Sequence, residues 1–191
     1  MKMKNQKLTD DTRLLINHWP AVEDILSAER QLHTQLTEFL HLLKSDLVKC
    51  SWWSHKWHFV EEDEEQAYIA HDNWRVRKSG YALWIGVEAV RPATLFGKEV
   101  YQQLYLWSGE DKPAFVAALR KLYQTKKLLP LGDVVEKPVG YVARKFLPKS
   151  LPGQAKAFEP TMRSSILKFF SFYARQEKAL STQVARHFNS K

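Results

Sequence analysis

The sequence has few cysteines, which cross-link small folds, and few glycines, which form cofactor-binding loops. A single cysteine, Cys50, excludes an intrachain disulfide framework and a four-cysteine zinc site. With only 7 glycines and 8 prolines, the 191-residue chain is neither collagen-like nor of low complexity. The glycines do not cluster into a phosphate-binding loop, and the sequence motifs of serine hydrolases and CxxC redox proteins are absent. We therefore expect no cofactor.

Long hydrophobic runs are also missing. No apolar stretch approaches the roughly 20 residues that cross a bilayer, so we expect no membrane span. The basic N-terminus precedes no hydrophobic stretch, which predicts the absence of a secretory signal. Together with the lone cysteine, these features lead us to expect a cytoplasmic protein.

Acidic residues are scarce in the second half of the chain. Residues 112–191 contain 16 Lys and Arg but only 4 Asp and Glu, whereas residues 1–111 contain 13 and 17. An excess of positive charge on one part of a chain predicts an anionic partner, either nucleic acid or an acidic protein. The alternative is that the acidic run Glu61-Glu62-Asp63-Glu64-Glu65 lies over the basic half and neutralises it within the monomer.

The spacing of apolar residues predicts a single α+β domain over residues 1–191. Aromatic and β-branched residues alternate in four short segments joined by short turns, which predicts an antiparallel meander to which a fifth strand adds at an edge. The four segments are 57–61, 67–76, 81–90 and 100–107. The expected parts are a helical region over 9–48, the sheet over 51–107, a helix over 111–127, a strand over 139–146 and a basic helix over 160–188.

The long helix expected to begin at Pro20 has an apolar stripe that only Glu29 interrupts. Its members recur at alternating spacings of three and four residues. We expect this stripe to pack on the core, with a dimeric coiled coil as the alternative. The members are Val22, Ile25, Leu32, Leu36, Phe39 and Leu43.

The C-terminal helix separates apolar and basic residues onto two faces. Lys and Arg on one face neutralise phosphate charges, although a solvated helix face has the same composition. A surface helix needed only for solubility would mix both signs of charge, and here Glu177 is the lone acid. The predicted anion-binding residues are Lys126, Lys127, Arg144, Lys145, Arg163, Lys168, Arg175 and Lys178.

Tryptophans are concentrated in the predicted sheet region. They could stack on nucleic-acid bases, but packing in the core or at a protein interface explains them more simply. Trp52 and Trp53 would point to opposite faces if they lay on a strand. One of them is therefore predicted to anchor a partner protein.

Two groups of side chains have the composition of metal or catalytic sites. No metal site is predicted, because the spacing of Cys50, His55, His58 and His71 matches no established zinc motif, and Cys50 is expected to be a small core residue. Asp72 and Glu88 lie on neighbouring predicted strands, a layout that resembles PD-(D/E)xK nucleases. Glu88-Ala89-Val90 lacks that family's lysine, and a structural ion pair from Glu88 to an arginine is the preferred interpretation.

The composition and motifs together predict a non-catalytic binding or adaptor protein whose basic C-terminal half engages nucleic acid or an acidic protein. Two alternatives stay open at this point. One is a metal-dependent nuclease using Asp72 and Glu88, and the other is an obligate subunit of a complex or a homo-oligomer.

Overall fold

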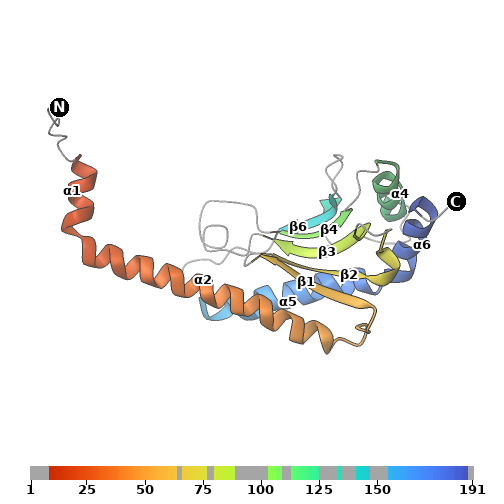
Figure 1. Cartoon of the computed structure of the whole chain (residues 1–191), viewed down its shortest axis with the longest axis horizontal. Helices are drawn as coiled ribbons and strands as arrows, with labels where there is room; N and C mark the ends of the chain where they lie inside the picture. Colours follow the sequence, from red (N-terminus) through yellow and green to blue (C-terminus); the bar gives the residue numbers. More distant parts are fainter. Residues whose placement is uncertain are drawn as a thin grey trace.

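The chain folds into helices and one antiparallel sheet, so it belongs to the α+β class (Figure 1). Within the described residues the sheet contains six strands in the order β1-β2-β3-β4-β6-β5, one more than the five predicted. No helix among the described residues is long and apolar enough to cross a membrane. The computed structural model describes residues 9–63, 66–76, 80–88, 103–108, 113–124, 133–134, 141–146 and 155–188.

Two helices form the N-terminal part, α1 (Asp10–Asn17) and α2 (Trp19–Val48). The hydroxyl of Thr9 accepts a hydrogen bond from the backbone N–H of Thr12 and caps α1. His18 ends α1, and Pro20 lies in the first turn of α2, where its missing N–H leaves no bond unmade.

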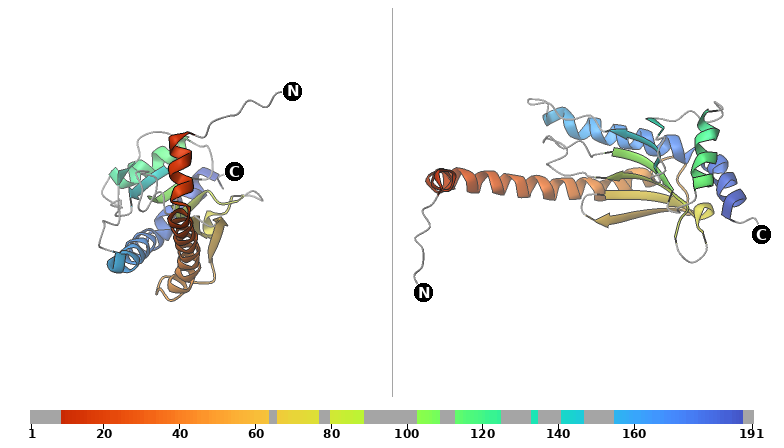
Figure 2. Two further views of the ribbon diagram at one scale, coloured as in Figure 1. Left: turned by 90° about the vertical axis from the view of Figure 1, so that its left-hand side faces the viewer. Right: turned by 90° about the horizontal axis from the view of Figure 1, so that it is seen from above.

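The predicted core packing of the long helix is correct only for its C-terminal half. The stripe residues Leu36, Phe39 and Leu43 are buried and Leu32 packs partly against the core, whereas Ile25 is 68% exposed. The N-terminal half of α2 extends beyond the sheet, and α1 turns away at its tip (Figures 1 and 2). The helix is longer than the sheet it crosses, so the stripe residues before Leu32 lie beyond the core formed by the described residues. We call α1 with the first part of α2, residues 10–31, the arm.

The first four strands form the predicted meander. They are β1 (Trp57–Asp63), β2 (Gln66–His71), β3 (Leu83–Glu88) and β4 (Gln103–Ser108), and each pairs antiparallel with the next. The second strand ends at His71 and not at residue 76, because a 3-10 turn, η1 (Asp72–Trp74), follows it. The imidazole of His71 accepts the backbone N–H of Asn73 and so stabilises that turn.

The last two strands correct the prediction of an edge position for the segment 139–146. Strand β6 (Tyr141–Phe146) pairs with β4 on one side and with β5 (Asp133–Val134) on the other. The two-residue β5 is too short to show an alternating pattern, which is why the sequence did not predict it.

The two faces of the sheet differ. Ile69, Ile85 and Val87 lie on the face that packs against the helices and are fully buried. On the opposite face, the ring of Tyr105 on β4 lies against Gly86 on β3, where a Cβ would overlap the ring. Only glycine leaves room for that ring.

Three helices complete the described structure, α4 (Pro113–Gln124), α5 (Ala155–Ala174) and α6 (Glu177–Phe188). The predicted single helix over 160–188 is wrong in two respects: α5 begins at Ala155, ahead of Pro160, and the helix breaks at Arg175-Gln176. The break allows α6 to change direction and contact η1 and α4 (Figure 1). The predicted apolar face is confirmed, with Met162, Ile166, Phe169, Tyr173, Leu180 and Val184 all buried.

Candidate functional site

The candidate site is the basic outer side of α5 and α6. Lys168 on α5, Arg175 in the break and Lys178 in the first turn of α6 are all exposed. Lys168 and Arg175 are seven residues apart, two helical turns, and therefore lie on the same side of the helix. In the part of the chain that the structure describes, none of these three side chains forms an ion pair. We call Lys168, Arg175 and Lys178 the basic edge.

Arg163 differs from the basic edge because its charge is already matched. Its Nε and one terminal nitrogen donate to the two carboxylate oxygens of Asp46 at the end of α2. The Asp46 side chain is only 12% exposed, and this shielding from water strengthens the bidentate contact. Arg163, one of the predicted anion-binding residues, therefore joins α2 to α5, and its charge is matched by Asp46 within the chain.

The other predicted anion-binding residues are distributed differently. Lys145 lies on β6, is half-buried and pairs in register with Leu104, so it is on the sheet and not on the basic edge. For Arg144 the structure describes the backbone alone, which pairs with Tyr105 and Asp133. Lys126 and Lys127 lie outside the described residues.

A shallow groove of about 560 Å³ runs along α5 beside the basic edge. It combines charged, hydroxyl and apolar side chains, so it offers an anion both Coulombic attraction and hydrogen-bond donors. The lining residues are Pro160, Arg163, Ser164, Leu167, Lys168 and Ser171.

The described part of the acidic run contacts α2 and not the basic edge. Glu61, the one member of the run whose side chain the structure describes, accepts a hydrogen bond of 2.7 Å from His41 on α2. The alternative in which the run neutralises the basic half thus has no support at Glu61.

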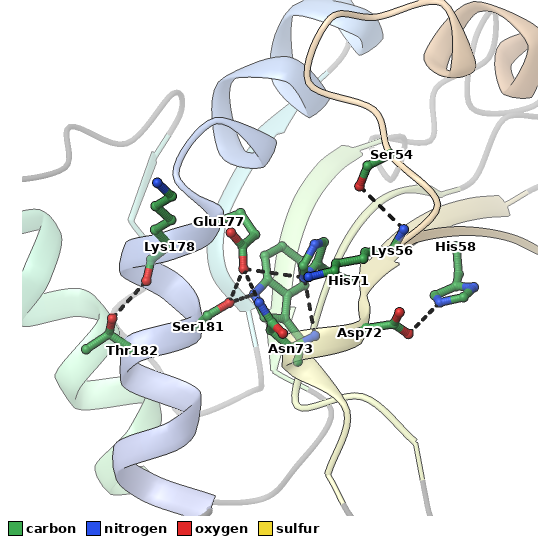
Figure 3. Close-up of polar contacts among 11 residues, drawn as sticks. Ser54, Lys56, His58, His71, Asp72, Asn73, Glu177, Lys178, Ser181 and Thr182 are labelled. Carbon is green, nitrogen blue, oxygen red and sulfur yellow. Dashed lines mark hydrogen bonds and ion pairs between the residues drawn. The ribbon is translucent and has the colours of Figure 1, made fainter.

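A polar cluster at the start of α6 was not predicted (Figure 3). One carboxylate oxygen of Glu177 accepts hydrogen bonds from Asn73 Nδ2 at 2.8 Å and from Ser181 Oγ at 2.5 Å. The indole N–H of Trp74 donates to Ser181, and His71 Nδ1 lies 3.4 Å from Glu177. The cluster fastens α6 to η1, and the isolation of Glu177 among basic residues was the signal that could have revealed it.

The pKa values of His71 and Glu177 are both lowered, for different physical reasons. Burial lowers the pKa of His71, although the negative charges of Glu177 and Asp72 oppose the shift. Burial alone would raise the pKa of Glu177, but the hydrogen bonds from Ser181 and Asn73 outweigh it and lower that pKa. A neutral imidazole beside a carboxylate is therefore the favoured state near neutral pH.

The histidines do not assemble a metal site. Trp57 pairs with His71 across β1 and β2, so His58, one residue later, points to the other face of the sheet. His58 instead hydrogen-bonds Asp72 at 2.7 Å, which lowers the pKa of that carboxyl. Cys50 donates weakly to the backbone carbonyl of Asp46, and no cluster of three metal-ligating side chains, including His55, occurs among the described residues.

The two nuclease candidates lie at opposite ends of the sheet. Ala67 pairs with Val87, so Glu88 is level with Gln66. Asp72 lies just beyond the far end of that strand, six residues from Gln66, which is about 20 Å away. One metal ion cannot bridge that separation, so the predicted pairing of Asp72 with Glu88 is wrong. In an antiparallel hairpin, residues late in one strand lie beside residues early in the next.

The adjacent tryptophans are not on a strand. Trp52 and Trp53 lie in the connection between α2 and β1 and are both half-buried. The Trp52 ring contacts the rings of Trp53 and Trp57, and its N–H donates to Ser171 on α5 at 2.9 Å. The contacts of Trp52 and Trp53 hold the connection after α2 against β1 and α5. The role of one of these tryptophans as a partner anchor stays a prediction.

Comparisons with models of protein families, with curated proteins and with solved structures find no match for this chain.

Proposed function

We propose that the chain is a non-catalytic, cytoplasmic binding protein whose basic edge, Lys168, Arg175 and Lys178, holds the phosphate backbone of a nucleic acid. The observation that carries the proposal is that these three exposed cations have no carboxylate partner among the described residues, whereas Arg163 beside them has one. Asp46 pairs with Arg163, whereas Lys168, Arg175 and Lys178 stay exposed to solvent.

Nucleic acid suits this surface better than a folded acidic protein. Lys168 and Arg175 are two helical turns apart and Lys178 follows three residues later at the start of α6, a spaced series of charges that suits the repeated phosphates of a polymer. The groove beside Lys168 is shallow. Lys and Arg neutralise phosphates without reading base sequence, so we expect weak sequence preference and strong salt dependence. Three phosphate contacts correspond to a loss of about 40-fold in affinity between 50 and 200 mM salt.

The test is a binding titration with labelled duplex DNA and single-stranded RNA, followed by fluorescence anisotropy over that salt range. Reversing the basic edge (Lys168→Glu, Arg175→Glu, Lys178→Glu) should abolish binding while the circular dichroism spectrum stays unchanged. A matched control reverses three cations in the first half of the chain, Arg13, Lys44 and Lys49, and changes the net charge equally.

Equal losses in both triple variants would show that net charge, and not the basic edge, governs binding. Failure of the unmodified protein to bind either nucleic acid at about 50 mM salt would overturn the proposal. Binding of an acidic polypeptide in place of nucleic acid would assign the same surface to a protein partner.

A further inference from the structure

The connection between α2 and β1 brings two tryptophans beside the basic edge. The indole N–H of Trp52 donates to the hydroxyl of Ser171 on α5 at 2.9 Å. At 100° per residue, Lys168, Ser171 and Arg175 fall within an arc of about 60°, and the backbone N–H of Arg175 still bonds to the carbonyl of Ser171. The hydroxyl that holds Trp52 therefore lies between two cations of the basic edge, on the same side of the helix.

The same connection continues towards the start of α6. The positive charge of Lys56 helps to lower the pKa of Glu177, the residue directly before Lys178. Residues 52–56 therefore pass from the end of α5 to the start of α6, the two places that carry Arg175 and Lys178. Ser171 also lines the shallow groove, so the groove, the tryptophans and the cations belong to one surface.

The two tryptophans have different surroundings. Trp52 is fixed by its bond to Ser171 and by the rings of Trp53 and Trp57, at 5.7 and 5.4 Å between centroids. Trp53 is half-buried, and among the described residues the one aromatic ring that it contacts is Trp52. Its backbone N–H bonds to the carbonyl of Cys50 at 2.9 Å, which fixes the turn. Trp52 is thus a positioning residue, and Trp53 is a pre-ordered ring that stays partly open to solvent.

We infer that Trp53 stacks on a base of a single-stranded nucleic acid whose phosphates lie on the basic edge. The inference rests on the proposed function and narrows its substrate class. Aromatic side chains hold unpaired bases by stacking, whereas the bases of a duplex are already stacked on each other. The cations alone hold the phosphates of either form, so the tryptophan distinguishes single strands from duplexes.

Anisotropy titrations with three labelled probes of about 20 nucleotides separate the bases from the phosphates. The probes are oligo(dT), its duplex with oligo(dA) and an abasic oligomer of the same length. The unmodified chain should bind oligo(dT) about tenfold more tightly than the abasic oligomer, because only oligo(dT) can stack. Trp53→Leu keeps an apolar side chain against the core but removes the aromatic face. It should weaken oligo(dT) binding about tenfold and change duplex binding less than about twofold.

Two controls separate stacking from damage to the fold. Trp19→Leu removes a tryptophan that is 47% exposed on the part of α2 extending beyond the sheet, and it should change none of the three affinities (Figure 1). Trp53→Phe keeps an aromatic ring and should retain most of the affinity for oligo(dT). Oligo(dT) should also quench the tryptophan fluorescence of the unmodified chain more than that of Trp53→Phe, because a stacked base quenches the indole that it covers.

Equal losses of oligo(dT) and duplex binding in Trp53→Leu would overturn the inference, because the variant would then act through the fold. An abasic oligomer that binds as tightly as oligo(dT) would overturn it too. In both cases, duplex binding that requires the basic edge would still support the proposed function. Absence of binding to all three probes would overturn both. Binding of polyglutamate in place of oligo(dT), weakened by Trp53→Leu, would assign Trp53 to an acidic protein partner and end the single-strand assignment.

Discussion

The two halves of α2 carry the same apolar stripe in different surroundings. In the half that crosses the sheet, Leu43 is 1% exposed, whereas Ile25 on the same side of the arm is 68% exposed. The halves do not differ in helical pattern, since both repeat apolar residues every three or four positions. The comparison teaches that periodicity shows which side of a helix is apolar, but what covers that side depends on the rest of the structure.

The two halves of α2 should differ most in how much the truncation of a stripe side chain lowers the free energy of unfolding. Leu43→Ala should lower the free energy of unfolding by about 3 kcal/mol, because it leaves a cavity in the core. Ile25→Ala should change it by less than about 0.5 kcal/mol, because the Ile25 side chain is mostly exposed. Urea denaturation measures both, and comparable losses would mean that the arm packs within the monomer.

A smaller difference is expected between an ion pair at the packed end of α2 and one on α1. Arg163→Ala should destabilise the protein by about 1–2 kcal/mol, because it leaves the mostly buried carboxylate of Asp46 without its donors. Arg163→Lys should recover part of the loss, since it restores the charge but not the two-pronged geometry. The matched change in the arm, Arg13→Ala, breaks an exposed pair with Asp10 and should cost at most about 0.5 kcal/mol. Equal effects would show that the Arg163 contact does not anchor α2.

The smallest expected effect is a change of stability with pH at the end of the sheet away from the arm. The folded pKa of His71 is below its ordinary value of 6.5, so the unfolded chain binds more protons just below that pH. Stability should therefore fall as the pH drops below about 6.5. Protonation would turn His71 Nδ1 into a donor and remove the bond that it accepts from Asn73.

His71→Asn should flatten this dependence, because its side-chain oxygen can still accept the Asn73 N–H but does not titrate in that range. The measurement is the urea midpoint at several pH values between 5 and 7. The lowered pKa of Glu177 acts separately, since its stabilisation is lost only as the pH falls through that still lower pKa. An identical pH dependence in wild type and variant would show that His71 is not responsible.

Local patterns predicted most of the helices and strands. Thr9 and Pro20 mark helix starts through bonds to neighbouring residues, and alternation over short stretches predicted β1 to β4. The same patterns did not predict β5, which is two residues long, or the break at Arg175-Gln176. Directly after that break, Glu177 contacts Asn73, a residue 104 positions away in the chain.

The candidate site was only partly predictable, because charge alone does not identify partners. Arg163 and Lys168 lie on the same helix and have the same sign of charge. They differ because Asp46, 117 residues from Arg163 in the chain, reaches one of them. The pairing of Asp72 with Glu88 failed for a similar reason, since strand register set them at opposite ends of the sheet.

The order of amino acids alone determined the α+β class, the apolar faces of the helices and the excess of positive charge near the C-terminus, because each depends on neighbours along the chain. The tertiary structure decided which half of the α2 stripe is covered, which arginine is neutralised and which polar groups meet at Glu177. Those outcomes depend on side chains that approach through space from distant positions, and no local pattern records such approaches.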